Sequence, residues 1–136
     1  MTLHEIITKV KTLHFPEGSY IVFGSCPMAA AGLREAGDID MLVTKELFNE
    51  LKQSGWTELV KNENDRPLTM GDFEAHYAWD FSSYKPTLEQ LLLTADVIDG
   101  IPFASLLEVR KWKLSSGRPK DFDDIKLIDN HISMIN

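Results

Sequence analysis

The sequence predicts an α/β (α+β) domain, in which helices flank a small mixed β-sheet. Short apolar segments rich in β-branched and aromatic residues alternate with segments whose apolar residues recur at helical spacing. Such alternation is typical of helices packed on a sheet. The 136 residues contain no linker, low-complexity tract or internal repeat, and their number matches one domain. We therefore expect a single domain over residues 1–136.

The first half of the chain is predicted to contain three helices and two strands. The segment "SYIVFGS" is β-branched and aromatic and ends in Gly-Ser, as expected for a buried strand. Pro27 suits the first turn of a short helix, where its missing N–H costs nothing. Thr44 is a suitable N-cap, and Gly55 a suitable stop, for a further helix. The elements are a helix over 3–13, a strand over 19–25, a helix over 27–35, a strand over 38–43 and a helix over 44–55.

The second half is predicted to contain three strands followed by three helices. Thr87 and Gln90 have the spacing of a capping box, and Gly117 is a suitable helix stop. The last two helices are expected to cover one face of the sheet. The predicted strands run over 56–61, 66–70 and 72–81, and the helices over 87–98, within 100–117 after a turn, and over 120–135. The apolar stripe of the last helix consists of Phe122, Ile125, Ile128, Ile132 and Ile135.

Composition limits the classes of function. The net charge is −7, from 14 Lys and Arg against 21 Asp and Glu, and this argues against long nucleic acids, which require a basic surface. Cys26 is the only cysteine, so no internal disulfide or Cys-based zinc site can form. The first residues lack a signal-peptide pattern, and no apolar stretch approaches the ~18 residues of a membrane span. We expect a cytoplasmic protein without membrane contact.

Two aspartates interrupt the apolar strand predicted over 38–43. Asp38 and Asp40 share one strand face, roughly 6 to 7 Å apart, because side chains alternate and the rise is ~3.3 Å per residue. Their mutual repulsion disfavours ionisation, and a bound Mg²⁺ removes that penalty. The alternative is that Gly37 and Asp38 form a turn and Asp40 is a solvated residue on an edge strand.

A third acid is predicted on the strand over 72–81. Asp80 shares a face with Glu74 and His76, while Tyr77, Trp79 and Phe81 on the other face are expected in the core. If this strand neighbours 38–43, three carboxylates converge, enough for a two-magnesium site that clamps a polyphosphate. Glu74 and His76 are further contributors to consider, although a half-buried structural role is the more frequent one for such a histidine.

The Gly24-Ser25 pair is a candidate phosphate site. A strand that ends in Gly-Ser and leads into a helix presents backbone N–H groups and a hydroxyl to an anion, and glycine permits close approach. The alternative is an ordinary strand-to-helix turn in which Ser25 caps the helix. Candidate cationic partners of a phosphate are Arg34, Lys113, Arg118 and Lys120. The alternative for each is a solvated surface charge, and for Arg118 and Lys120 a further alternative is pairing with Asp121, Asp123 and Asp124.

Together, "YIVFGS", "DIDMLV" and the acid in "YAWDF" resemble the nucleotidyltransferase fold of the DNA polymerase β superfamily. The segments "LREAGDID" and "KLSSGRPKDFDDIKLI" are similar to small bacterial nucleotidyltransferase-like proteins. The resemblance covers 20–43 and 106–129 and is thin over 55–100. It implies that Asp38 and Asp40 bind magnesium on a triphosphate and that Asp80 ligates a second metal and helps to deprotonate an acceptor hydroxyl. It further implies that Gly24 and Ser25 hold the β- and γ-phosphates.

The resemblance implies a magnesium-dependent nucleotidyltransferase, with Mn²⁺ as the other metal to consider. It would move a nucleoside monophosphate from an NTP to a hydroxyl-type acceptor, either a small molecule or a protein. The alternative is a non-catalytic nucleotide-binding or antitoxin-like protein of the same fold, which an Asp80 that faces solvent would favour. Because 136 residues leave little beyond the catalytic core for recognition of an acceptor, a homodimer or a partner chain remains an open expectation.

Overall fold

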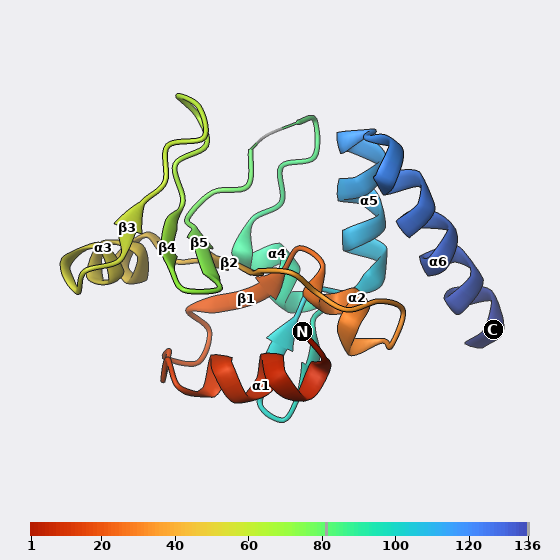
Figure 1. Cartoon of the computed structure of the whole chain (residues 1–136), viewed down its shortest axis with the longest axis horizontal. Helices are drawn as coiled ribbons and strands as arrows, with labels where there is room; N and C mark the ends of the chain where they lie inside the picture. The colour runs from red at the N-terminus through yellow and green to blue at the C-terminus, as the bar shows by residue number, and fades with distance from the viewer. Residues whose placement is uncertain (81, 136) are drawn as a thin grey trace.

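A computed structural model describes residues 1–80 and 82–135, and for residue 135 the backbone alone. The expected core position of Phe81 and the side chain of Ile135 lie outside the described residues. Seven strands form one sheet in the order β3-β4-β5-β2-β1-β7-β6, with helices on both sides (Figure 1). The predicted combination of a mixed sheet with flanking helices is confirmed.

The centre of the sheet consists of four strands whose register positions the site: β1 (Tyr20–Phe23), β2 (Ile39–Val43), β5 (Phe73–His76) and β7 (Ile101–Phe103). Strand β2 runs antiparallel to β1 and parallel to β5. In this register Asp40 lies opposite Phe23 on one side and Glu74 on the other. The carboxyl end of β1 therefore meets the amino ends of β2 and β5.

The outer strands are shorter: β3 (Thr57–Glu58), β4 (Leu68–Met70) and β6 (Asp96–Ile98). Strand β6 corrects the prediction, because residues 96–98 were expected to end a helix. They pair instead with β7 in an antiparallel hairpin. Its two-residue turn is Asp99-Gly100, with φ of 52° and 79°, a conformation that Asp-Gly favours in tight hairpins. The Asp-Gly pair was the sequence signal for these two strands.

Six helices lie within the described residues: α1 (Leu3–Lys11), α2 (Cys26–Ala30), α3 (Lys45–Gln53), α4 (Leu88–Leu93), α5 (Leu106–Ser116) and α6 (Pro119–Ile135). Each overlaps a predicted helix, but α2 and α4 end before the predicted ends at residues 35 and 98. The Thr44 side chain caps α3 by accepting from the Leu47 N–H, at 3.1 Å. Thr87 and Gln90 form the predicted capping box of α4. The predicted N-terminal signals therefore located both helices.

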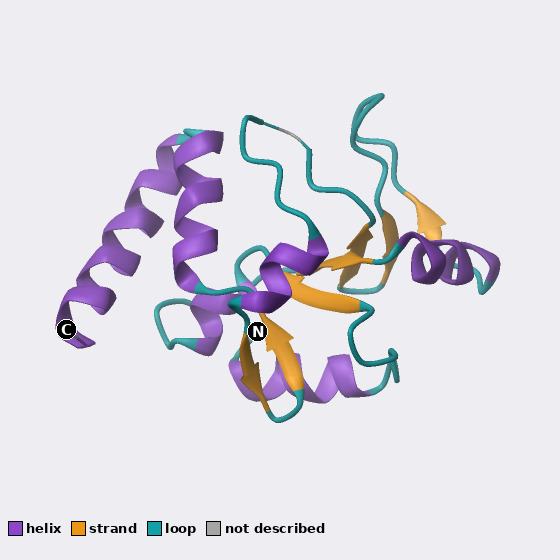
Figure 2. Ribbon diagram, turned by 180° about the vertical axis from the view of Figure 1, so that it is seen from behind, coloured by secondary structure: helices purple, strands orange, loops and turns teal. Residues whose placement is uncertain are grey.

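The core lies on both faces of the sheet. On one face, Val22, Met41 and Val43 pack with residues of α1 and α3. On the other face, Ile21, Phe23 and Leu42 pack with α4, Trp79 and Trp112 of α5. Ile128 of α6 forms a third buried cluster with Met28 of α2 and Val109 of α5, and the two last helices pair at one end of the sheet (Figure 2). The expectation that both last helices cover one sheet face was wrong for α6, because α4 and Trp112 of α5 cover that face.

Two long connections rise on the same side of the sheet as the junction of α5 and α6 (Figure 1). One joins β3 to β4, and the other joins β5 to α4. No helix within the described part of the chain is long and apolar enough to cross a lipid bilayer.

Candidate active site

A cluster of potential metal ligands lies where β2 and β5 run side by side. Asp40 and Glu74 are register partners on these parallel strands, and His76 follows two residues later on the same face of β5. The ligand atoms of these three side chains lie within 4.8 Å of one another. Glu74 and His76 are buried, while Asp40 is half-buried. The fold thus concentrates two carboxyl groups and an imidazole at one point.

The turn after β1 packs directly against Asp40. Gly24 has a φ of +67°, and a Cβ at this position would lie 2.3 Å from the Asp40 Oδ2 atom. Only glycine leaves room for the carboxylate and adopts this backbone conformation without strain. Ser25 follows at the N-cap of α2, where its side chain makes no capping hydrogen bond. The side chain of Ser25 is therefore not used as the cap that the alternative interpretation required.

The predicted third acid, Asp80, does not lie on a strand. Strand β5 ends at His76 because neither neighbouring strand can continue the pairing. Strand β2 has only Val43 left beyond the Leu42–His76 pair. Strand β4 is preceded by Pro67, which has no N–H to extend the ladder beyond the Leu68–Ala75 pair. Asp80 lies in the following connection, is exposed, and forms an ion pair with Lys85 at 3.2 Å. Glu74 takes the position beside Asp40 that the sequence assigned to Asp80.

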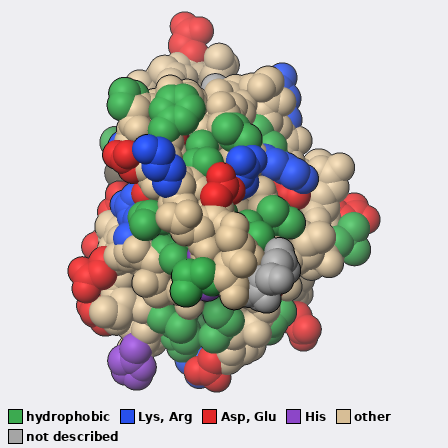
Figure 3. Space-filling model, turned by 90° about the vertical axis from the view of Figure 1, so that its right-hand side faces the viewer, with side chains coloured by type: hydrophobic (Ala, Val, Ile, Leu, Met, Phe, Trp, Pro, Cys, Tyr) green, Lys and Arg blue, Asp and Glu red, His purple; other side chains and the backbone are tan. Residues whose placement is uncertain are grey.

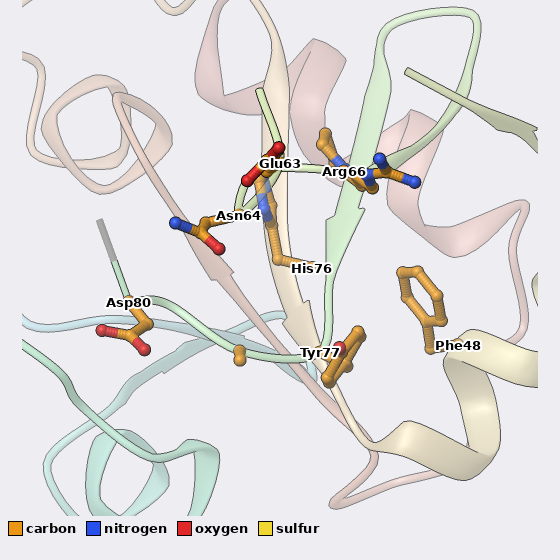
Figure 4. A pocket seen from close by; sticks show the side chains of 9 residues that line it. Phe48, Glu63, Asn64, Arg66, His76, Tyr77 and Asp80 are labelled. Atoms are coloured by element: carbon orange, nitrogen blue, oxygen red, sulfur yellow. The ribbon is translucent and has the colours of Figure 1, made fainter. Parts of the chain in front are cut away.

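Asp80 instead lines a cavity of about 450 Å³ that His76 also lines. Figure 4 shows this cavity, with Glu63 and Asn64 near His76, Tyr77 and Phe48 on another side, and Asp80 further along the connection that begins at Tyr77. Tyr77, expected in the core, is 53% exposed and packs edge-on against Phe48. Trp79 is buried as expected. The end of the strand at His76 explains the exposure of Tyr77, since the alternation of side chains stops there.

The electrostatics of the cluster are those of negative groups held close together. Burial, followed by the hydrogen bond and charge of Glu74, raises the pKa of Asp40 to about 8. Burial also acts to raise the pKa of Glu74, but hydrogen bonds from Lys61 and Asp40 lower it overall. Lys61 forms an ion pair with the Glu74 carboxylate. The site therefore holds one ammonium group and is disposed to accept further positive charge.

A second group of charges lies across from the carboxylates, where α5 meets α6. Lys113 is buried and contacts Asp124 at 2.8 Å and Asp121 at 3.4 Å. Asp124 also accepts two hydrogen bonds from Arg34, at 2.8 and 3.0 Å. Asp121 accepts a two-pronged contact from Arg118, at 2.9 and 3.1 Å. The two aspartates thus fix three cations, which accounts for the pattern of the "KLSSGRPKDFDD" segment.

Both charge groups line one cavity of about 500 Å³. From the side of α5 and α6, basic side chains lie beside acidic ones across the middle of the surface (Figure 3). The cavity brings together most of the residues that the sequence singled out. The predicted metal and phosphate ligands among its lining residues are Ser25, Arg34, Asp38, Asp40, Lys113, Arg118 and Lys120. Asp38 is exposed at its rim, one residue before β2, while Gly24 and Asp80 do not line it.

Sequence analysis overlooked Lys61 and Asp65 and gave Glu74 and His76 only secondary places. All four line the same cavity. Glu74 and His76 were on the predicted strand, so a pairing of that strand with "DIDML" in the correct register would have identified them. No sequence signal marked Lys61 or Asp65, because the turn that brings them to the site consists of common polar residues.

Comparison with known proteins supports the fold. No protein-family model matches the chain, and no curated protein matches it. The chain is similar to the solved structure of ANT(2″)-Ia in complex with adenylyl-2″-tobramycin, with a TM-score of 0.55, 15% identity, and coverage of 96% of this chain and 87% of that one. At this identity the likeness shows the fold alone. The nucleotidyltransferase fold predicted from the sequence is therefore confirmed.

Proposed function

We propose that the protein is a nucleotidyltransferase dependent on Mg²⁺ or Mn²⁺, which moves a nucleoside monophosphate from an NTP to a hydroxyl group. The observation that carries the proposal is one cavity with carboxylates on one wall and fixed cations on the other. A triphosphate with bound metal presents both signs of charge, and this cavity complements both. The similarity to a nucleotidyltransferase structure supports the fold on which such sites occur.

The reaction forms a bond between the acceptor oxygen and the α-phosphorus, and it breaks the bond between that phosphorus and the oxygen that bridges to the β-phosphate. Pyrophosphate leaves with the bonding electrons, and the acceptor hydroxyl loses its proton. Alignment and charge neutralisation supply most of the rate enhancement in such transfers. In this proposal Arg34, Lys113 and Lys120 bind the phosphates, and Ser25 donates its hydroxyl to them.

The residues present fit a divalent metal. Burial and a neighbouring carboxylate raise the pKa of Asp40, so the site favours a proton unless a stronger cation replaces it. In the proposal Asp38, Asp40 and Glu74 hold the metal, with Glu74 in the role that the sequence assigned to Asp80. The metal supplies neutralisation of phosphate charge and lowers the pKa of an acceptor hydroxyl. Glu74 is also positioned to accept that proton.

Asp80 at the surface would by itself favour the non-catalytic alternative, a nucleotide-binding or antitoxin-like protein. Glu74 removes this objection, because it supplies a third carboxylate beside Asp40. The neighbouring structure contains adenylyl-2″-tobramycin, in which the acceptor is a small molecule. We therefore propose a small-molecule hydroxyl as the acceptor ahead of a protein side chain, bound within this chain or with help from a second copy or a partner.

The first test is nucleotide binding. We expect Mg²⁺ or Mn²⁺ with an NTP to raise the melting temperature. At an NTP concentration of 100 times Kd, binding adds about 2.7 kcal/mol to the free energy of unfolding. Asp38→Asn combined with Asp40→Asn should abolish this rise. No rise with any NTP at millimolar concentration contradicts both the catalytic and the binding function.

Turnover is tested by pyrophosphate release with a panel of hydroxyl acceptors. Glu74→Gln should retain nucleotide binding and lose turnover by at least about 100-fold, because it removes a metal ligand and proton acceptor. Asp80→Asn is the matched control and should retain both. Equal loss in both variants, or loss in Asp80→Asn alone, would contradict the assignment of Glu74.

A further inference from the structure

We infer that His76 is a metal ligand, and that this nitrogen donor makes the site select a first-row transition-metal ion such as Mn²⁺ over Mg²⁺. The inference rests on the metal site of the proposed function and concerns its composition. An all-carboxylate site suits Mg²⁺, which prefers oxygen ligands. An imidazole ligand suits first-row transition-metal ions, with affinity that rises along the row from Mn²⁺. Mn²⁺ also accepts carboxylate ligands, so a mixed site of two carboxylates and one imidazole suits it better than Mg²⁺.

The position of His76 follows from the strand. Glu74 and His76 lie two residues apart on β5 and point to the same face, while Ala75 between them is buried in the core of the opposite face. The ligand atoms of Asp40, Glu74 and His76 lie within 4.8 Å of one another. Ligand atoms around one ion, with bonds of about 2.1 Å, lie roughly 3 to 4 Å apart. Small side-chain rotations therefore suffice to bring all three onto one ion.

A carboxylate stands behind the ring. The Nδ1 atom of His76 lies 3.8 Å from Oδ1 of Asp65, which the β3–β4 connection carries to the site. Metal-binding histidines commonly direct their second nitrogen to a carboxylate, which fixes the ring orientation and the tautomer. Asp65 can take this role when Nε2 faces the ion. The edge of the ring also packs against Trp79, with centroids 4.9 Å apart, which limits its rotation.

The test measures metal binding without nucleotide. Wild-type protein, His76→Gln and the exposed control His4→Gln are titrated with MnCl₂ and with MgCl₂ by calorimetry. We expect wild type and His4→Gln to bind Mn²⁺ more tightly than Mg²⁺. His76→Gln should lose at least about tenfold in Mn²⁺ affinity and change much less toward Mg²⁺. Electron–nuclear double resonance of the Mn²⁺-loaded wild type should detect one imidazole nitrogen coupling, which ¹⁵N-histidine labelling shifts and His76→Gln removes.

Absence of a nitrogen coupling in the Mn²⁺-loaded wild type overturns the inference, whether or not the His76 variant folds. Equal loss of Mg²⁺ and Mn²⁺ affinity in His76→Gln, with folding confirmed by circular dichroism, overturns it too. Binding of Mn²⁺ with a nitrogen coupling but without any nucleotidyl transfer supports the inference and contradicts the proposed function. Nucleotidyl transfer by a protein whose bound metal shows no nitrogen coupling supports the proposed function and contradicts the inference. No saturable binding of either metal contradicts both.

Discussion

At the scale of single residues, the contact between Gly24 and Asp40 is the tightest constraint on the site. A Cβ on residue 24 would lie 2.3 Å from a carboxylate oxygen of Asp40 and 3.0 Å from its Cβ. Both residues belong to neighbouring strand ends, so neither backbone can retreat without disturbing the β1–β2 ladder. Gly24 is therefore required by the position of Asp40, independently of any contact with a phosphate.

Gly24→Ala should separate strain from function. We expect a loss of about 1 to 2 kcal/mol in the free energy of unfolding from the left-handed backbone, together with loss of the metal–nucleotide melting shift because Asp40 is displaced. Gly32→Ala is the matched control: its φ is +73°, but no atom lies within 4 Å of the added Cβ. It should lose similar stability in urea and keep the nucleotide shift. Loss of the shift in both variants would show that strain, not contact with Asp40, is responsible.

At the scale of elements, the α5–α6 pair is held by buried charges. The side chains of Lys113, Asp121 and Asp124 are at most 6% exposed. Breaking such a pair leaves an uncompensated buried charge, which is costlier than the pair's net contribution to stability. Arg34, from the loop after α2, reaches Asp124 across 90 positions of sequence. The network therefore joins two distant segments at the edge of the cavity.

Asp124→Asn should lower the free energy of unfolding by about 3 kcal/mol. Burial acts to raise the pKa of Asp124, but the hydrogen bonds and charges of Lys113 and Arg34 lower it below its ordinary value of 3.8. A lowered folded-state pKa stabilises the protein above the unfolded-state pKa, and this stabilisation is lost as the pH falls through the folded-state value. Urea unfolding from pH 7 to pH 2.5 should show an acid-dependent loss in wild type that Asp124→Asn reduces. The variant Asp123→Asn, at an exposed position, should resemble wild type. If the difference in free energy of unfolding between wild type and Asp124→Asn were the same at every pH, the role of the Asp124 charge would be contradicted.

At the scale of the whole molecule, the sequence predicted the α/β (α+β) class and most of the elements correctly. Local signals sufficed for them: the caps Thr44 and Thr87 and the β-branched segment before Gly24 each act within a few residues. The sequence also indicated the cation wall, since Arg34, Lys113 and Lys120 all line the cavity. Pairing between strands was harder, because the position of Glu74 beside Asp40 depends on a register between residues 34 apart. The end of β5, and hence the exposure of Asp80, depends on neighbouring strands in the same way.

The aromatic cluster under the cavity should contribute strongly to global stability. Phe23 is fully buried and packs against Trp79 at 4.8 Å and Trp112 at 5.5 Å between ring centroids. Phe23→Ala should cost about 3 to 5 kcal/mol in urea unfolding. Phe122→Ala, on the exposed side of α6, should stay within about 0.5 kcal/mol of wild type. A small effect of Phe23→Ala would mean that the cluster tolerates a void.

The ion pairs from α6 to Lys113 and Arg34 make the cavity depend on a segment far from the carboxylates in sequence. Lys113 pairs with Asp121 and Asp124, and Arg34 pairs with Asp124. A chain truncated before residue 121 would lack both counter-ions and leave these two cations unfixed. Such a truncated chain should therefore be unable to bind a triphosphate, even where its sheet has formed.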